Sequence, residues 1–137
     1  MRHKFQKKSG FTMLEIIIVI IIIGILASVA LPKYFKTVEY ARGFEALVIL
    51  GNLRFAMYRY YAPQRTYLGA TLDNLDVENP MSFPATQRSF DYVLVAGLPT
   101  FDKFTITATR RGDPTSSSIA IDQDGIKTGT GSYNGVR

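Results

Sequence analysis

The sequence predicts an α+β protein in which a long N-terminal α-helix, membrane-spanning in its first half, packs against a small antiparallel β-sheet head. Residues 11–31 form an almost unbroken apolar run, and residues 32–62 continue with helical periodicity. The last third of the chain contains short segments of alternating apolar and polar residues, which indicate strands. We therefore expect a basic leader at 1–10 that is cleaved, a helix at 11–62 and a globular head at 63–137.

Composition limits the chemistry that the chain can perform. Its 137 residues include no cysteine and a single histidine, His3. Disulfides, thiolate metal sites and catalysis based on histidine or cysteine are therefore excluded. The nearest set of carboxylates, Asp73, Asp76 and Glu78, lies in a polar segment where solvated acids are expected. We expect no enzyme activity and no cofactor.

The basic charge of the chain belongs mainly to its start. The net charge is +5, yet Arg2, Lys4, Lys7 and Lys8 all lie in the first ten residues, without an acid among them. The remaining 127 residues carry 12 Lys and Arg against 11 Asp and Glu. A nucleic-acid-binding protein needs a basic patch on its folded part. No specific nucleic-acid partner is expected, and the charge lends no support to a DNA-binding role.

The apolar run from Phe11 to Leu31 is long enough to cross a bilayer. It holds 21 residues with Glu15 as the only charged one, and a helix of that length measures about 30 Å. The basic residues before it predict a cytoplasmic N-terminus, since this flank is more basic than the one with Lys33 and Lys36. An ordinary signal peptide fits less well, because its apolar region is usually only about 7–15 residues long. A buried core helix fits less well too, because the run is apolar on every side.

Glu15 needs an explanation, because an ionised carboxylate in hydrocarbon is costly. If the chain is cut after Gly10, Phe11 becomes a cationic N-terminus four residues before Glu15. The carboxylate then complements the positive end of the helix dipole, which contributes only about 0.3–1 kcal/mol. In a packed assembly of many copies it can also pair with the amine of a neighbour, since neither charge is tolerated alone in an apolar environment. Such a pair would set the register between subunits.

The segment "KKSGFTMLEIIIVIIIIGILASVALPKY", residues 7–34, resembles the N-terminal signature of type IV pilins and of the related pseudopilins of type II secretion. The resemblance implies that a membrane-embedded prepilin peptidase cuts between Gly10 and Phe11 and methylates Phe11. It also implies that Glu15 pairs with another subunit. Gly24 and Pro32 fall where filament pilins bracket a stretch of helix that is able to unwind.

The residue chemistry of Gly24 and Pro32 agrees with that implication. Glycine lowers helix propensity, and proline removes one helical hydrogen bond. The segment between them is therefore the most easily stretched part of the helix. A second interpretation is close packing, because Gly24 and Ser28 form a pair of small residues on one helix face.

Beyond the membrane segment, the helix carries apolar residues on two roughly opposite sides. An isolated head needs only one apolar helix face, so the second face needs another partner. The partner is either neighbouring subunits or a second layer of the same domain, and the sequence does not say which stripe does which. The first stripe consists of Ala41, Phe44, Val48, Gly51, Phe55 and Tyr58, and the second of Ala46, Ile49, Leu53, Ala56 and Met57.

The head is predicted as a loop followed by a strand meander. Pro63 should end the helix, and a polar loop should extend to about residue 88. Strands are expected at 89–96 and at 103–110, and two more in "SSIAIDQDGIKTG".

Two features of the head leave open questions. Asp122 and Asp124 in "DQDG" are weak candidates for a calcium site, although Asp-Gly is first a hairpin turn. The match to the family in the head is one of general order only. Many pilins close this region with a disulfide, so something else must hold the tail "GTGSYNGVR" here, or it is loose.

We expect a structural pilin subunit that polymerises from the cytoplasmic membrane into an extracellular type IV pilus for adhesion, motility or DNA uptake. The alternative within the family is a pseudopilin of a type II secretion system, which forms a short periplasmic fibre for protein export. The implied partners are further copies of the chain in a helical filament, the prepilin peptidase, the inner-membrane platform with its ATPase, and lipid before assembly. An alternative from another class is a single-pass membrane protein with a ligand-binding or enzymatic head.

Overall fold

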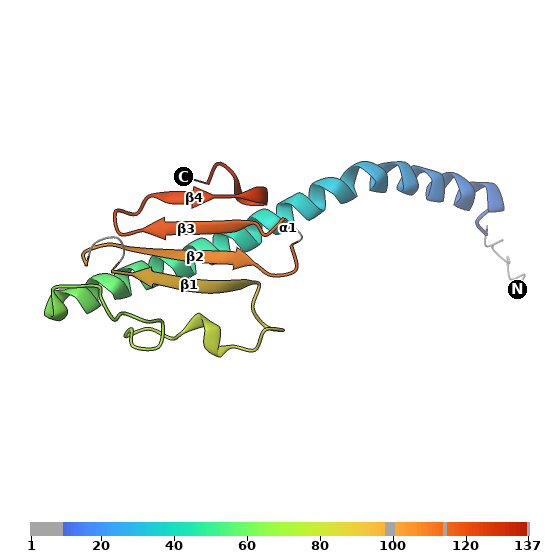
Figure 1. Ribbon diagram of the computed structural model, residues 1–137. Coiled ribbons are helices and arrows are strands. Elements are labelled where there is room, and N and C mark those ends of the chain that lie inside the picture. Colours follow the sequence, from blue (N-terminus) through green and yellow to red (C-terminus); the bar gives the residue numbers. More distant parts are fainter. Residues whose placement is uncertain (1–9, 98–100, 114, 137) are drawn as a thin grey trace, which may run out of the picture. The chain divides into compact units, whose positions relative to one another are not determined.

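The computed structural model describes residues 10–97, 101–113 and 115–136 (Figure 1). The expected basic leader therefore lies, apart from Gly10, outside the described residues. The chain forms two compact units, the first ending at Thr37 and the second beginning at Val38. One helix, α1 (Met13–Gln64), contributes to both units. The second unit adds the loop and the sheet.

Over its described residues, the first unit consists of residues 10–12 and the N-terminal part of α1. The helix begins beside Thr12, whose Oγ1 accepts a hydrogen bond from the amide of Glu15 at 3.2 Å. Threonine is a favoured residue at this position because it satisfies an amide that has no helical partner. The most apolar stretch of α1 is not buried in the structure. By length and composition, α1 is able to cross a membrane.

The C-terminal end of α1 lies slightly beyond the position expected from Pro63. The helix includes Pro63 in its last turn and ends at Gln64. The amide of Arg65 still bonds the carbonyl of Tyr61, at 2.8 Å, and Arg65 adopts φ = 57°. Proline removes one donor but leaves the following amides free to bond. The left-handed conformation of Arg65 therefore ends the helix, two residues after the expected boundary.

The sheet is the antiparallel meander that the sequence predicts. It contains β1 (Phe90–Ala96), β2 (Phe104–Arg110), β3 (Ser118–Asp122) and β4 (Lys127–Gly129) in sequential order. All three pairings are antiparallel. Short 3₁₀ helices, η1 (Pro80–Ser82) and η2 (Gly131–Tyr133), lie before β1 and after β4. Figure 1 shows the sheet beside the C-terminal part of α1.

The core lies between the sheet and the second half of α1. Phe104, Ile106 and Ala108 of β2 are buried, as their alternation predicts, whereas the threonines between them face outward. The predicted α+β fold class, with a long helix packed against a four-stranded antiparallel sheet, is confirmed. The helix side of the core consists of Gly43, Ala46, Leu50, Leu53, Ala56 and Met57.

Candidate assembly surfaces

The predicted processing site lies at the exposed start of the described chain. Gly10 is exposed, and Phe11 keeps 78% of its surface accessible. Glu15 lies in the first turn of α1 and is also exposed. The three residues are therefore close in sequence and accessible. Their predicted roles in cleavage, methylation and subunit pairing stay predictions.

Gly24 and Pro32 both lie inside α1, which continues through them. A methyl group added to Gly24 would meet no atom within 4 Å. The hydroxyl of Ser28 donates to the carbonyl of Ile25 at 2.7 Å. Because Pro32 has no N–H, the carbonyl of Ser28 cannot receive its usual helical bond. The unwinding predicted for this stretch stays a prediction, since the isolated chain is helical here.

The two apolar stripes of α1 have different environments. The stripe that includes Ala46, Leu53 and Met57 packs into the core. The other stripe is accessible, with Phe44 67% exposed and Phe55 58% exposed. The described head therefore covers only one of the two stripes, and the alternative in which the domain covers both is wrong. Exposed apolar strips of this kind mark interaction surfaces.

A groove runs between α1 and the loop that follows it. Its larger part has a volume of about 450 Å³, and a smaller part of about 220 Å³ shares Ile49, Pro80 and Phe83 with it. Glu78 lines only the larger part and Glu45 only the smaller. The further lining side chains of the larger part are Asn52, Leu53, Phe55, Arg59 and Val77. Sequence reasoning missed this groove, because the loop's path depends on distant contacts.

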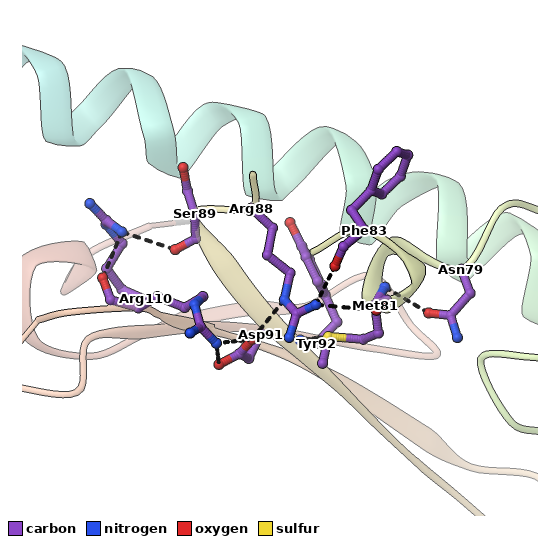
Figure 2. Close-up of polar contacts among 9 residues, drawn as sticks. Asn79, Met81, Phe83, Arg88, Ser89, Asp91, Tyr92 and Arg110 are labelled. Atoms are coloured by element: carbon purple, nitrogen blue, oxygen red, sulfur yellow. Dashed lines mark hydrogen bonds and ion pairs between the residues drawn. The ribbon is translucent and has the colours of Figure 1, made fainter. Parts of the chain in front are cut away.

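Arg88 holds the loop wall of the groove in place (Figure 2). Its guanidinium donates to the carbonyls of Met81 and Phe83, at 3.1 and 2.5 Å, and its Nε donates to Asp91 at 2.9 Å. Asn79 caps η1 by accepting from the amide of Met81 at 2.8 Å. The Arg111 guanidinium beside Asp91 holds the pKa of that carboxyl below its usual value, against the opposing effect of burial. The loop wall is thus organised before any partner binds.

The C-terminal tail is fixed by a polar cluster around Glu39. Oε1 of Glu39 accepts from the Tyr133 hydroxyl at 2.5 Å and from Arg110 Nε at 2.7 Å. Arg42 donates to the other oxygen, Oε2, at 3.1 Å. Burial acts to raise the pKa of Glu39, but the hydrogen bonds from Tyr133, Arg110 and Arg42 outweigh it and lower that pKa. The cluster joins the start of the second unit to the end of the chain.

Tyr133 is also the apolar anchor of the tail. Its side chain is 2% exposed, and its ring packs against Phe90 with the ring centres 5.7 Å apart. A methyl group on Gly43 would lie 2.9 Å from the Tyr133 ring, so glycine leaves the space that this ring fills. In η2, Gly131 has φ = 59°, and a methyl group there would lie 2.2 Å from Ser117 Oγ. The tail is therefore held by packing and hydrogen bonds.

The predicted calcium candidates lie in the turn between β3 and β4. Asp122 accepts from the amide of Ile126 at 2.8 Å, and Asp124 accepts from the side chain of Gln123 at 2.7 Å. Gly125 has φ = 83° and bonds the carbonyl of Asp122 at 3.1 Å, as in a hairpin turn. Among the described residues, no three His, Cys, Asp or Glu side chains gather in a way that could hold a metal ion. The turn explains both aspartates without a metal.

Part of the chain is similar to known fimbrial proteins. Residues 5–31 match the family described as the prokaryotic N-terminal methylation motif. Fimbrial protein EcpC of Eikenella corrodens is 44% identical over 57 residues, which are 42% of this chain and 37% of that protein. Type IV major pilin protein PilE1 of Neisseria gonorrhoeae is 43% identical over 54 residues, 39% of this chain and 33% of that protein.

A further relative matches over a longer stretch of the chain. A probable minor fimbrial protein of Dichelobacter nodosus is 35% identical over 71 residues, 52% of this chain and 45% of that protein. The chain thus matches less than half the length of these curated relatives. No solved structure matches the chain significantly. The N-terminal region of this chain carries the prokaryotic N-terminal methylation motif, and its curated relatives are type IV pilins and fimbrial proteins.

Proposed function

We propose that this protein is a structural pilin subunit that polymerises from the cytoplasmic membrane into a type IV pilus filament. The observation that carries the proposal is the pair of uncovered apolar surfaces on one helix. The first half of α1 is apolar and unburied, and the second half exposes Phe44, Val48 and Phe55. Lipid can cover the first surface before assembly, but the second lies beyond the membrane segment and needs a protein partner.

In the proposed mechanism, the N-terminus of the precursor is in the cytoplasm and the head is on the outer side. A prepilin peptidase cuts between Gly10 and Phe11 and methylates the new amine. Removal of the leader frees that amine to pair with Glu15 of a neighbouring copy as apolar helices pack. The inner-membrane platform and its ATPase supply the work of assembly. The role is mechanical and requires no cofactor.

The proposed role of Glu15 follows from the cost of burying charge. An amine and a carboxylate that enter an apolar filament together are much less costly than either alone. A copy docked out of register would leave both unpaired. The pair therefore selects the correct position of an incoming subunit rather than adding much net stability. Gly24 and Pro32 then mark the stretch of α1 that is most easily extended under load.

Filament imaging tests the proposal. Cells that express the full chain with its peptidase and platform should carry long surface fibres that react with antibody to the head. A variant with Gly10→Val, which blocks the cut, should accumulate in the membrane and form no fibres. Absence of fibres from cells in which the processed wild-type subunit accumulates would contradict the proposal. Short periplasmic fibres alone would favour the pseudopilin alternative instead.

A further inference from the structure

We propose that the groove between α1 and the following loop binds the segment Lys33–Lys36 of a second copy of this chain. The inference rests on the proposed function, because it names a contact within the filament. The segment carries Tyr34 and Phe35 between two lysines. Both aromatic side chains are accessible, at 62% and 66% exposed.

The groove has an apolar lining that suits aromatic side chains. Ile49, Pro80 and Phe83 line both of its parts, and Phe55 connects the larger part with the exposed stripe of α1. The volume of about 450 Å³ falls in the usual range of binding pockets. The Arg88 hydrogen bonds fix the loop wall, so little ordering is needed when a partner docks.

The charges at the rim favour a partner with lysines. Arg59 and Arg88 also line the groove; Arg59 is paired with Asp76, whereas Arg88 shares Asp91 with Arg111 and donates to two loop carbonyls. Glu45 and Glu78 form no ion pair within the described part of the chain, and they lie on different parts of the groove. The rim is therefore acidic. The methylene groups of Lys33 and Lys36 can pack beside the apolar groove, while their ammonium groups reach the carboxylates of Glu45 and Glu78.

Other exposed apolar segments fit the acidic rim less well. Phe101 is 66% exposed, but Asp102 follows it directly. Ile126 is 60% exposed, but Asp124 lies two residues before it. In each segment the acid offsets the nearby lysine, Lys103 or Lys127, so neither segment brings a net positive charge to Glu45 and Glu78. The segment Lys33–Lys36 has no acid within two residues on either side.

The proposed contact joins two different surfaces of the same chain. When such a contact is made head to tail and its rotation does not close a ring, it continues from copy to copy as an open helix, which suits a filament. The Tyr34 and Phe35 rings are 6.0 Å apart in an edge-to-face arrangement, so the pair forms one compact apolar projection.

Charge reversal in the full chain tests the contact. Three variants are compared with the wild type: the double variant Lys33→Glu and Lys36→Glu, the double variant Glu45→Lys and Glu78→Lys, and the fourfold variant that carries all of these substitutions. Filaments are sedimented from cells with matched membrane levels of subunit, and the fraction of subunit in filaments is measured. Each pair alone should lower the filament fraction by roughly tenfold, because two rim attractions become repulsions. The fourfold variant should regain most of the loss, since the charges are again complementary. Reversal of Lys103 or Asp124, which are exposed outside the groove, should leave the filament fraction unchanged.

The outcomes separate this inference from the proposed function. Suppose that the wild type forms filaments. The groove contact would then be overturned if neither double variant lowers the filament fraction, or if the fourfold variant does not recover it, and the pilin role would stay intact. If the processed wild-type chain forms no filaments at all, both proposals fail. Recovery confined to the fourfold variant supports the contact, because a merely destabilised head would not be rescued by adding two more substitutions.

Discussion

The hydroxyl of Tyr133 donates a 2.5 Å hydrogen bond to Oε1 of Glu39, which joins residues 94 positions apart in the chain. The same oxygen accepts from Arg110 of β2. This contact ties the tail to α1 in a chain that has no cysteine for a disulfide. It therefore performs by hydrogen bonding and packing the closure that a covalent link performs in other small domains.

Removal of the Tyr133 hydroxyl should weaken the second unit. Tyr133→Phe keeps the ring but loses a hydrogen bond to a charged group, which contributes about 1.5–3 kcal/mol. We expect a destabilisation near the lower end of that range, because Arg110 still pairs with Glu39. Tyr133→Ala should cost more, about 3–5 kcal/mol, since it also leaves a cavity. Thermal unfolding of the full chain in mild detergent measures both, and an unchanged Tyr133→Phe midpoint would show that the bond contributes nothing.

Two glycines of α1 offer a matched comparison. A methyl group on Gly43 would lie 2.9 Å from the buried Tyr133 ring, whereas one on Gly51 would meet nothing within 4 Å. Gly51→Ala should stabilise the chain by about 0.5–1 kcal/mol through helix propensity. Gly43→Ala gains the same propensity but should be destabilising overall, because overpacking costs about 1–3 kcal/mol. Equal shifts of the unfolding midpoint for both variants would contradict the close approach of Tyr133.

The Glu39 cluster should make stability depend on pH in the acidic range. The pKa of Glu39 in the folded chain lies below its ordinary value of 4.5, although burial alone would raise it. A lowered folded pKa contributes stability that is complete above the unfolded value and is lost as pH falls through the folded one. Stability should therefore decline below about pH 4.5, and Glu39→Gln should decline less steeply. Denaturant unfolding from pH 3 to pH 7 compares the two slopes, and parallel curves would exclude a contribution from Glu39.

Much of the fold follows from the sequence because local patterns decide it. The alternation of Phe104, Ile106 and Ala108 correctly assigns β2 and its buried face. The two stripes of α1 were also predicted, but only the structure shows that the one with Phe44 and Phe55 is exposed. Periodicity gives the faces of a helix, whereas which face is covered depends on the path of the loop and sheet.

The parts that the sequence did not predict depend on long-range contacts. Tyr133 stands in a polar segment with no periodic signal, and its partners Glu39 and Gly43 lie about ninety residues earlier. Arg88 is one of many scattered arginines until the structure shows that it binds the loop carbonyls. The available sequence signal for the way the tail is held was Tyr133 itself, the one aromatic residue of "GTGSYNGVR". Buried tyrosines pack through the ring and usually form a hydrogen bond through the hydroxyl.

Glu15 should matter for assembly and not for membrane insertion. Glu15→Gln removes the negative charge while keeping the size of the side chain, so the chain should reach the membrane and be cut as before. Without the carboxylate, the amine of Phe11 in a neighbouring copy has no partner inside the filament. We expect filament yield to fall by at least tenfold, measured by sedimentation against total membrane subunit. Normal filament amounts from this variant would contradict the proposed pairing.

The N-terminus of the mature protein tests the central claim most directly. The proposed processing converts Phe11 into the first residue and methylates its amine, so it leaves a chemical record that no ordinary membrane anchor carries. Mass spectrometry of the N-terminal peptide from protein isolated with its peptidase should find a chain that starts at methylated Phe11. A mature chain that starts at Met1 would contradict the pilin account.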